Sequence, residues 1–124
     1  MNGIFIDLKY LEQYLHILQI KDHIISSNIA NAETPFYKKL KLEISFNHDI
    51  PLKVTKRKHI QNNLSPFSYR IKTVQNSLLG SDRNNVDLQQ ELMSLEKVSL
   101  TYKTILKFVK NTFSTLELVI KSGG

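Results

Sequence analysis

The sequence predicts a mainly α-helical protein in which long N- and C-terminal helices pair as a coiled-coil-like hairpin, with a short irregular and β-containing segment between them. Three observations predict this. Apolar residues recur at steps of four and three near both ends, no Gly or Pro interrupts residues 86–121, and apolar and polar residues alternate briefly in between. The chain therefore divides into an N-terminal helix at 1–33, a middle segment at 34–84 and a C-terminal helix at 85–124.

Two apolar stripes run along the N-terminal helix. The first has heptad spacing, which keeps one stripe against a partner helix, and it is interrupted only by Asp22: Ile4, Leu8, Leu11, Leu15, Leu18, Ile25, Ile29 and Ala32. The second stripe lies beside it: Tyr10, Tyr14, Ile17, Ile24 and Asn28. Two stripes imply more than one packing neighbour. Because the second has no evident partner within the chain, we expect both terminal helices to be dynamic in the free subunit.

The C-terminal helix repeats the heptad pattern more strictly. Its seam comprises Leu88, Leu92, Leu95, Ser99, Tyr102, Leu106, Val109, Phe113, Leu116 and Ile120. Asn85 or Asp87 can cap the first turn, Asp87 pairing with Gln90 in a capping-box-like arrangement, and the helix stops at Ser122 and the following glycines. An uninterrupted helix of this length would run about 50 Å and favours coiled-coil packing.

The middle segment predicts short strands. Leu40, Leu42, Ile44 and Phe46 alternate with polar residues, as half-buried strand residues do. The alternation repeats briefly at 52–54 and 67–71, and Pro51, Pro66 and polar runs separate the pieces.

The composition excludes several classes of protein. The chain has 124 residues and no cysteine, so disulfides and thiolate metal sites are excluded. Its formal net charge of +6 permits an acidic partner, but the lysines are scattered, and the densest basic run, at 53–58, is typical of a solvated loop. No apolar run approaches the roughly 20 residues of a membrane span. The N-terminus lacks the basic and apolar regions of a cleaved secretory signal.

No catalytic, cofactor or metal site is predicted. His16 and His23 lie seven residues apart on a helix, about 10 Å along its axis, which is too far for one ion. His48 and His59 have no nearby carboxylate pattern, and no phosphate-binding or hydrolase motif occurs. We therefore expect neither an enzyme nor a cofactor.

The stretch SSNIANAETPFYK, from Ser26 to Lys38, closely resembles the N-terminal signature of bacterial flagellar axial proteins. Together with NNVDLQQEL and SLTYKTIL near the C-terminus, it resembles the proximal-rod proteins of the flagellar basal body, the FlgB family. The resemblance implies a structural rod subunit, exported without a cleaved signal peptide and assembled in the periplasm. Its implied partners are other rod proteins, the rod-base adaptor, the MS ring and the export gate.

Within this resemblance we expect seventeen residues to form subunit interfaces: Leu11, Leu15, Leu18, Ile25, Asn28, Ile29, Asn31, Ala32, Pro35, Tyr37, Leu92, Leu95, Tyr102, Leu106, Val109, Phe113 and Leu116. The amides of Asn28 and Asn31 are expected to reach backbone groups of a neighbour, and Pro35 to end the helix. The family usually has Gly after this proline. Phe36 stands there instead and favours a type I turn or an extended exit.

Two other readings compete with a rod subunit. A cytosolic export chaperone or adaptor of the same secretion system would also be small and helical, but it would be a stable folded dimer on its own. A basic nucleic-acid-binding module would need Lys or Arg along one helix face, whereas Lys97, Lys103, Lys107 and Lys110 fall on several faces.

Overall fold

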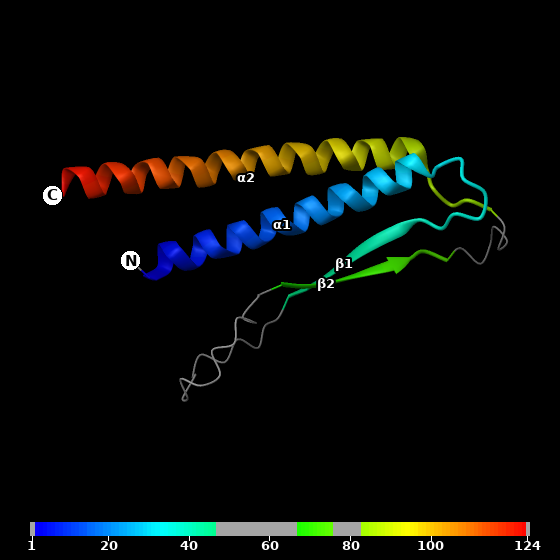
Figure 1. The fold of residues 1–124 in the computed structure, drawn as a ribbon, viewed down its shortest axis with the longest axis horizontal. Helices are drawn as coiled ribbons and strands as arrows, with labels where there is room; N and C mark the ends of the chain where they lie inside the picture. Colours follow the sequence, from blue (N-terminus) through cyan, green and yellow to red (C-terminus); the bar gives the residue numbers. More distant parts are fainter. Residues whose placement is uncertain (1, 47–66, 76–82, 124) are drawn as a thin grey trace, which may run out of the picture.

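The computed structural model describes residues 2–46, 67–75 and 83–123. In chain order they form helix α1 (Asn2–Ala30), strand β1 (Leu40–Phe46), strand β2 (Phe67–Thr73) and helix α2 (Leu88–Ser122). The two helices run antiparallel, and the hairpin of strands lies beside α1 (Figure 1). The predicted helical hairpin with a β-containing middle is confirmed. The expected strand at 52–54, the basic run at 53–58, His48 and His59 lie outside the described residues.

The core lies where the two helices approach each other. Leu18, Ile25 and Val98 are its buried centre, and the partly buried side chains packed against it are Tyr14, Ile29, Leu95, Tyr102 and Ile105. Toward the chain termini the helices separate (Figure 1). The far part of α2 consequently keeps Phe113 56% exposed and Ile120 75% exposed.

The second stripe of α1 is buried within the chain. Ile17 is 3% exposed and Ile24 is 7% exposed, and the Tyr14 ring lies 6.4 Å from the Phe67 ring of β2. The expectation that this stripe lacks an internal partner is therefore wrong. The hairpin contacts α1, and sequence periodicity could not reveal this because it shows an apolar face without showing what covers it.

The strands pair antiparallel, with Leu42 opposite Ile71 and Ile44 opposite Tyr69, so the alternation seen in the sequence gives one apolar face. The other face is charged, and Lys72 binds Glu43 at 2.7 Å. This hydrogen bond with Lys72 holds the pKa of the exposed Glu43 carboxyl below its ordinary value.

Helix α2 begins at the N-cap Asp87, whose carboxylate accepts from the Gln90 backbone N–H at 3.2 Å. This confirms one of the two caps predicted. Several hydroxyls on α2 bond the carbonyl four residues earlier, among them Thr101 to Lys97 and Thr112 to Phe108. A hydroxyl that bonds a carbonyl of its own helix finds a partner without interrupting the helix, so these Thr and Ser residues are compatible with a long helix.

Candidate functional site: the signature junction

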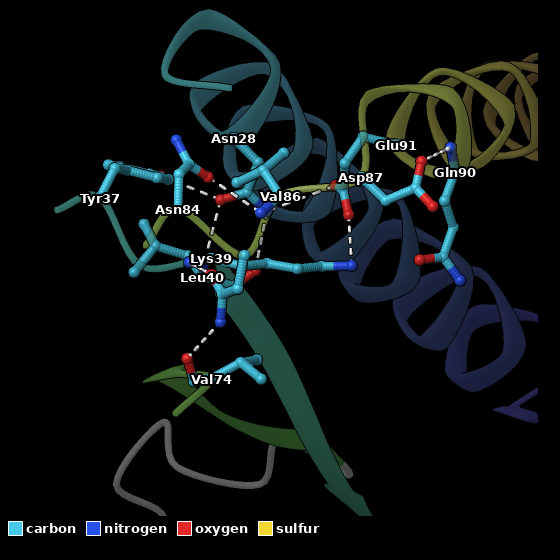
Figure 2. Close-up of polar contacts among 11 residues, drawn as sticks. Asn28, Tyr37, Lys39, Leu40, Val74, Asn84, Val86, Asp87, Gln90 and Glu91 are labelled. Carbon is cyan, nitrogen blue, oxygen red and sulfur yellow. Dashed lines mark hydrogen bonds and ion pairs between the residues drawn. The ribbon is translucent and has the colours of Figure 1, made fainter. Parts of the chain in front are cut away.

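The residues of the signature meet the NNVD stretch at the end of the molecule where α1 and β1 lie beside the start of α2. A polar network connects them, and Figure 2 shows most of it. We call this network the junction and define it by six residues: Asn28, Tyr37, Lys39, Asn84, Asn85 and Glu91.

Asn28 is the centre of the junction. It is 1% exposed, and its amide uses every hydrogen-bonding position that it has. Its Oδ1 accepts from the Leu40 N–H and the Tyr37 hydroxyl, each at 2.9 Å. Its Nδ2 donates to the Leu40 carbonyl at 2.9 Å and to Glu91 Oε2 at 3.3 Å. All of these groups are satisfied within the chain, so the amide serves the fold of the subunit itself, and the expected contact with a neighbouring subunit stays a prediction.

The double contact with Leu40 has a specific geometry. The Val74 N–H donates to the Lys39 carbonyl at 2.8 Å, so the backbone groups of Leu40 point to the other edge of β1. Asn28 binds both of them there, as the backbone of an adjacent strand would. The side chain thereby fixes the first residue of β1 against the last turns of α1.

A buried ion pair lies next to Asn28. Lys39 Nζ is 2.5 Å from Glu91 Oε1, with the Glu91 side chain 3% exposed and that of Lys39 24% exposed. A buried carboxylate is tolerated when it is paired and hydrogen-bonded, and Glu91 has both Lys39 and Asn28 as partners. Because Glu91 is in the first turn of α2, the pair joins α2 to the segment before β1.

Asn84 and Asn85 hold the remaining segments. Asn84 Nδ2 donates to the carbonyls of Asn31 at 2.7 Å and Thr34 at 2.9 Å, which closes the loop after α1. Asn85 accepts from the Lys39 N–H and donates to the Val74 carbonyl, both at 2.7 Å, and so bridges the open end of the hairpin. The helix cap predicted at Asn85 or Asp87 is therefore Asp87, and Asn85 binds the hairpin instead.

Asn31 makes fewer side-chain hydrogen bonds than Asn28, and they are more local. Its Nδ2 donates to the Ser27 carbonyl at 2.8 Å, and its Oδ1 accepts from the Thr34 hydroxyl at 3.2 Å. The Ser27 carbonyl already accepts from the Asn31 N–H at 3.1 Å. Both side-chain contacts are local and partly exposed, so Asn31 can be changed without leaving a buried group unpaired.

The turn after α1 differs from the sequence-based expectation. The Tyr37 N–H donates to the Thr34 carbonyl at 3.3 Å, and Phe36 has φ of 64°. A positive φ at this third position is the pattern of a type II turn, so the expected type I turn or extended exit is wrong. The left-handed region costs a residue with a Cβ about 1–2 kcal/mol. The bonds that Asn84 and Tyr37 make on either side hold Phe36 there.

The predicted interface residues fall into three groups by burial. Leu18, Ile25 and Asn28 are buried in the chain. Those partly buried are Leu11, Leu15, Ile29, Asn31, Ala32, Tyr37, Leu95, Tyr102, Leu106, Val109 and Leu116. Pro35, Leu92 and Phe113 are exposed, the last two by 50% and 56%. Nothing in the isolated chain tests their contacts with other subunits, so the interface assignment stays a prediction.

The predicted C-terminal seam includes residues that pack on the core and residues that do not. Leu95 and Tyr102 pack on the core, but the core residue of α2 is Val98, which the predicted seam omitted. Glu91, Leu95, Val98, Tyr102 and Ile105 follow steps of four and three equally well, and that pattern could have revealed them. Among the other residues of the predicted seam, Leu92, Phe113 and Ile120 are exposed and Leu106 is partly buried. We call Leu92, Leu106, Phe113 and Ile120 the outer stripe.

The described residues contain no group of three or more His, Asp or Glu side chains that could hold a metal ion. None of the described helices is long and apolar enough to cross a membrane. What the fold and the junction define is an elongated helical-hairpin subunit whose polar network is satisfied internally and whose longest helix presents apolar side chains outward.

Comparison with known proteins agrees with this class. The chain is 36% identical over 119 residues to the flagellar basal body rod protein FlgB of Aquifex aeolicus, covering 95% of both chains. It is 26% identical to FlgB of Bacillus subtilis, covering 94% of both, and 27% identical to FlgB of Borreliella burgdorferi, covering 98% of this chain and all of that one. No protein-family model matches it. The chain belongs to the FlgB family of flagellar basal body rod proteins.

Proposed function

We propose that the chain is a structural subunit of the flagellar basal-body rod and that it polymerises through its terminal helices, with the outer stripe of α2 against neighbouring subunits. The rod role follows from membership of the FlgB family. The observation that supports the interface is the exposure of Leu92, Phe113 and Ile120, each at least half exposed, with Phe113 and Ile120 on the part of α2 that extends beyond the core.

The spacing of the outer stripe supports packing between helices. Its members repeat at multiples of seven residues, which is the spacing of a coiled-coil seam. Large apolar side chains that are exposed at this spacing mark an interaction surface. A rod requires contacts that do not close on themselves, since heterologous contacts generate open helical assemblies.

The partners proposed for this subunit are other rod proteins, the rod-base adaptor, the MS ring and the export gate, and its proposed location is the periplasmic rod after export without a cleaved signal. We assign it no catalytic role. Family membership does not favour the export-chaperone and nucleic-acid-binding readings.

A charge placed in the outer stripe tests the interface. Phe113→Asp should leave the fold intact, because Phe113 is already 56% exposed, but it should stop rod assembly, because burying an unpaired carboxylate costs several kcal/mol. Asn111→Asp is the matched control: it changes the net charge equally at an exposed position two residues away.

Both variants are to be compared in cells lacking their own copy of the gene, with basal bodies viewed by electron microscopy and the purified chains checked by circular dichroism. Complete rods with Phe113→Asp, or equal loss with both variants, would contradict the interface.

A further inference from the structure

We infer that Phe36 is an anchor between copies of this chain, its ring entering the cleft between α1 and α2 of the next copy. The inference rests on the proposed function, because it assigns one contact of the self-assembly. It starts from an unusual residue. Phe36 is strained at φ of 64° and is 69% exposed, so its ring contributes little packing within its own subunit. Strain of this kind is found mostly at functional sites.

The turn presents Phe36 rigidly. The backbone on its two sides is fixed by the Thr34 N–H to Asn31 carbonyl bond of 3.0 Å and the Tyr37 N–H to Thr34 carbonyl bond of 3.3 Å. Asn84 also binds the Thr34 carbonyl at 2.9 Å. An exposed aromatic ring on a rigid turn loses little conformational freedom when it is buried by a partner, and this favours its use as an anchor.

A cleft that suits an aromatic ring lies between α1 and α2. Its volume is about 500 Å³, and a cavity of about 150 Å³ already accepts benzene. The residues that line it are Leu18, Gln19, Asp22, Leu95, Val98, Ser99, Tyr102 and Lys103. Leu18 and Val98 give it an apolar floor, and both are 5% exposed. Leu18, Leu95 and Tyr102 are also among the residues that the sequence predicts at subunit interfaces.

The ring cannot reach the cleft of its own subunit. Leu18 is twelve residues before the end of α1 at Ala30, which is about 18 Å along the helix axis. A contact between Phe36 and the cleft therefore joins two copies through different surfaces. Such a heterologous contact repeats along an open assembly, as a rod requires.

Charges on the two surfaces are compatible with this contact. The cleft rim carries Asp22 and Lys103, and the loop around Phe36 carries Glu33 and Lys38. Arg83, whose carbonyl accepts from Lys38 Nζ at 2.6 Å, adds a second base beside the loop, so the loop surface is slightly basic and Asp22 is the group of the cleft that attracts it.

Cysteine pairing gives the sharpest test, because the chain has no cysteine of its own. Purified full-length Glu33→Cys, which carries its thiol in the same loop and keeps the Phe36 ring, is mixed under mild oxidation with full-length Ser99→Cys, whose side chain lines the cleft. The control replaces the second chain with Met93→Cys, which is 67% exposed on α2 but does not line the cleft. We expect the 33–99 disulfide to exceed the 33–93 disulfide at least tenfold. Equal yields, or no disulfide at all, would overturn the inference.

Phe36→Gly gives a second readout, because glycine relieves the strain while removing the ring. The variant should fold at least as stably as the parent chain, yet the concentration needed for self-association should rise about tenfold or more. Met93→Ala is the matched control and should leave that concentration unchanged. Unchanged association by Phe36→Gly would refute the anchor. Rods lost with Phe113→Asp but unaffected by Phe36→Gly would leave the proposed function standing without it.

Discussion

Replacing Asn28 by alanine should destabilise the folded subunit itself, and the structure sets the magnitude. The change removes the partner of four groups: the Leu40 N–H and carbonyl, the Tyr37 hydroxyl and the Glu91 carboxylate. Leaving one buried polar group unpaired costs about 1–3 kcal/mol. Tyr37 and Glu91 keep other partners, in Ser27 and Lys39, so the main losses fall on Leu40. We therefore expect a loss of about 2–4 kcal/mol in the free energy of unfolding.

The assay is urea unfolding of the purified chain followed by far-ultraviolet circular dichroism. A loss of this size moves the midpoint by roughly 1–2 M urea, since chains of this length lose about 1–3 kcal/mol per molar urea. Asn31→Ala is the matched control in the same signature. It should cost less than about 1 kcal/mol, because the Ser27 carbonyl keeps its backbone partner.

A further variant separates hydrogen bonding from volume. Asn28→Asp keeps the shape but turns the Nδ2 donor into an oxygen that faces the Leu40 carbonyl and the Glu91 carboxylate. It should be at least as damaging as the alanine change. Equal midpoints for the Asn28 and Asn31 variants, or a stable Asn28→Asp chain, would refute the view that this amide serves folding within the subunit.

Two other predictions follow from the same contacts. Glu91→Ala should lower the free energy of unfolding, measured with urea, by about 2–3 kcal/mol. This is less than the roughly 3–5 kcal/mol of a fully buried pair, because the Lys39 side chain is 24% exposed. A loss below about 0.5 kcal/mol would contradict the ion pair. In hydrogen-exchange measurements on the free chain, amides at 17–28 and 91–105, around the core, should be protected, and amides at 113–122, where α2 lies beyond the core, should exchange fast. Uniformly fast exchange would instead support the sequence-based expectation that both helices are dynamic.

The sequence predicted elements better than it predicted their contacts. The period of the apolar residues predicted both helices and the strand at 40–46 because that period is a local property of the chain. It could not reveal that the hairpin contacts α1, since a stripe does not identify its partner. It also placed the α2 seam so that Val98 was missed, because two overlapping sets of residues satisfy the same spacing.

The signature can be recognised from the sequence, but the contacts that its residues make within the chain differ from those that the sequence suggested. Asparagines near a helix end suggested contacts with another subunit, whereas Asn28 binds a strand that begins twelve residues later and a glutamate sixty-three residues away. Such long-range partners are set by the tertiary fold and leave no local pattern. Phe36 shows the same limit: its own preference disfavours a positive φ, and the bonds of Asn84 and Tyr37 override that preference.

The central claim is that this chain is a structural component of the rod. It is tested most directly by quantitative mass spectrometry of purified basal bodies, using cells that carry the chain and cells from which its gene is deleted. We predict that the chain is present in purified basal bodies in amounts comparable to other rod proteins, and that the deletion yields basal bodies without a rod. A chain that is absent from purified basal bodies and remains in the cytosol, although rods fail to form without it, would contradict the claim and identify an export factor instead.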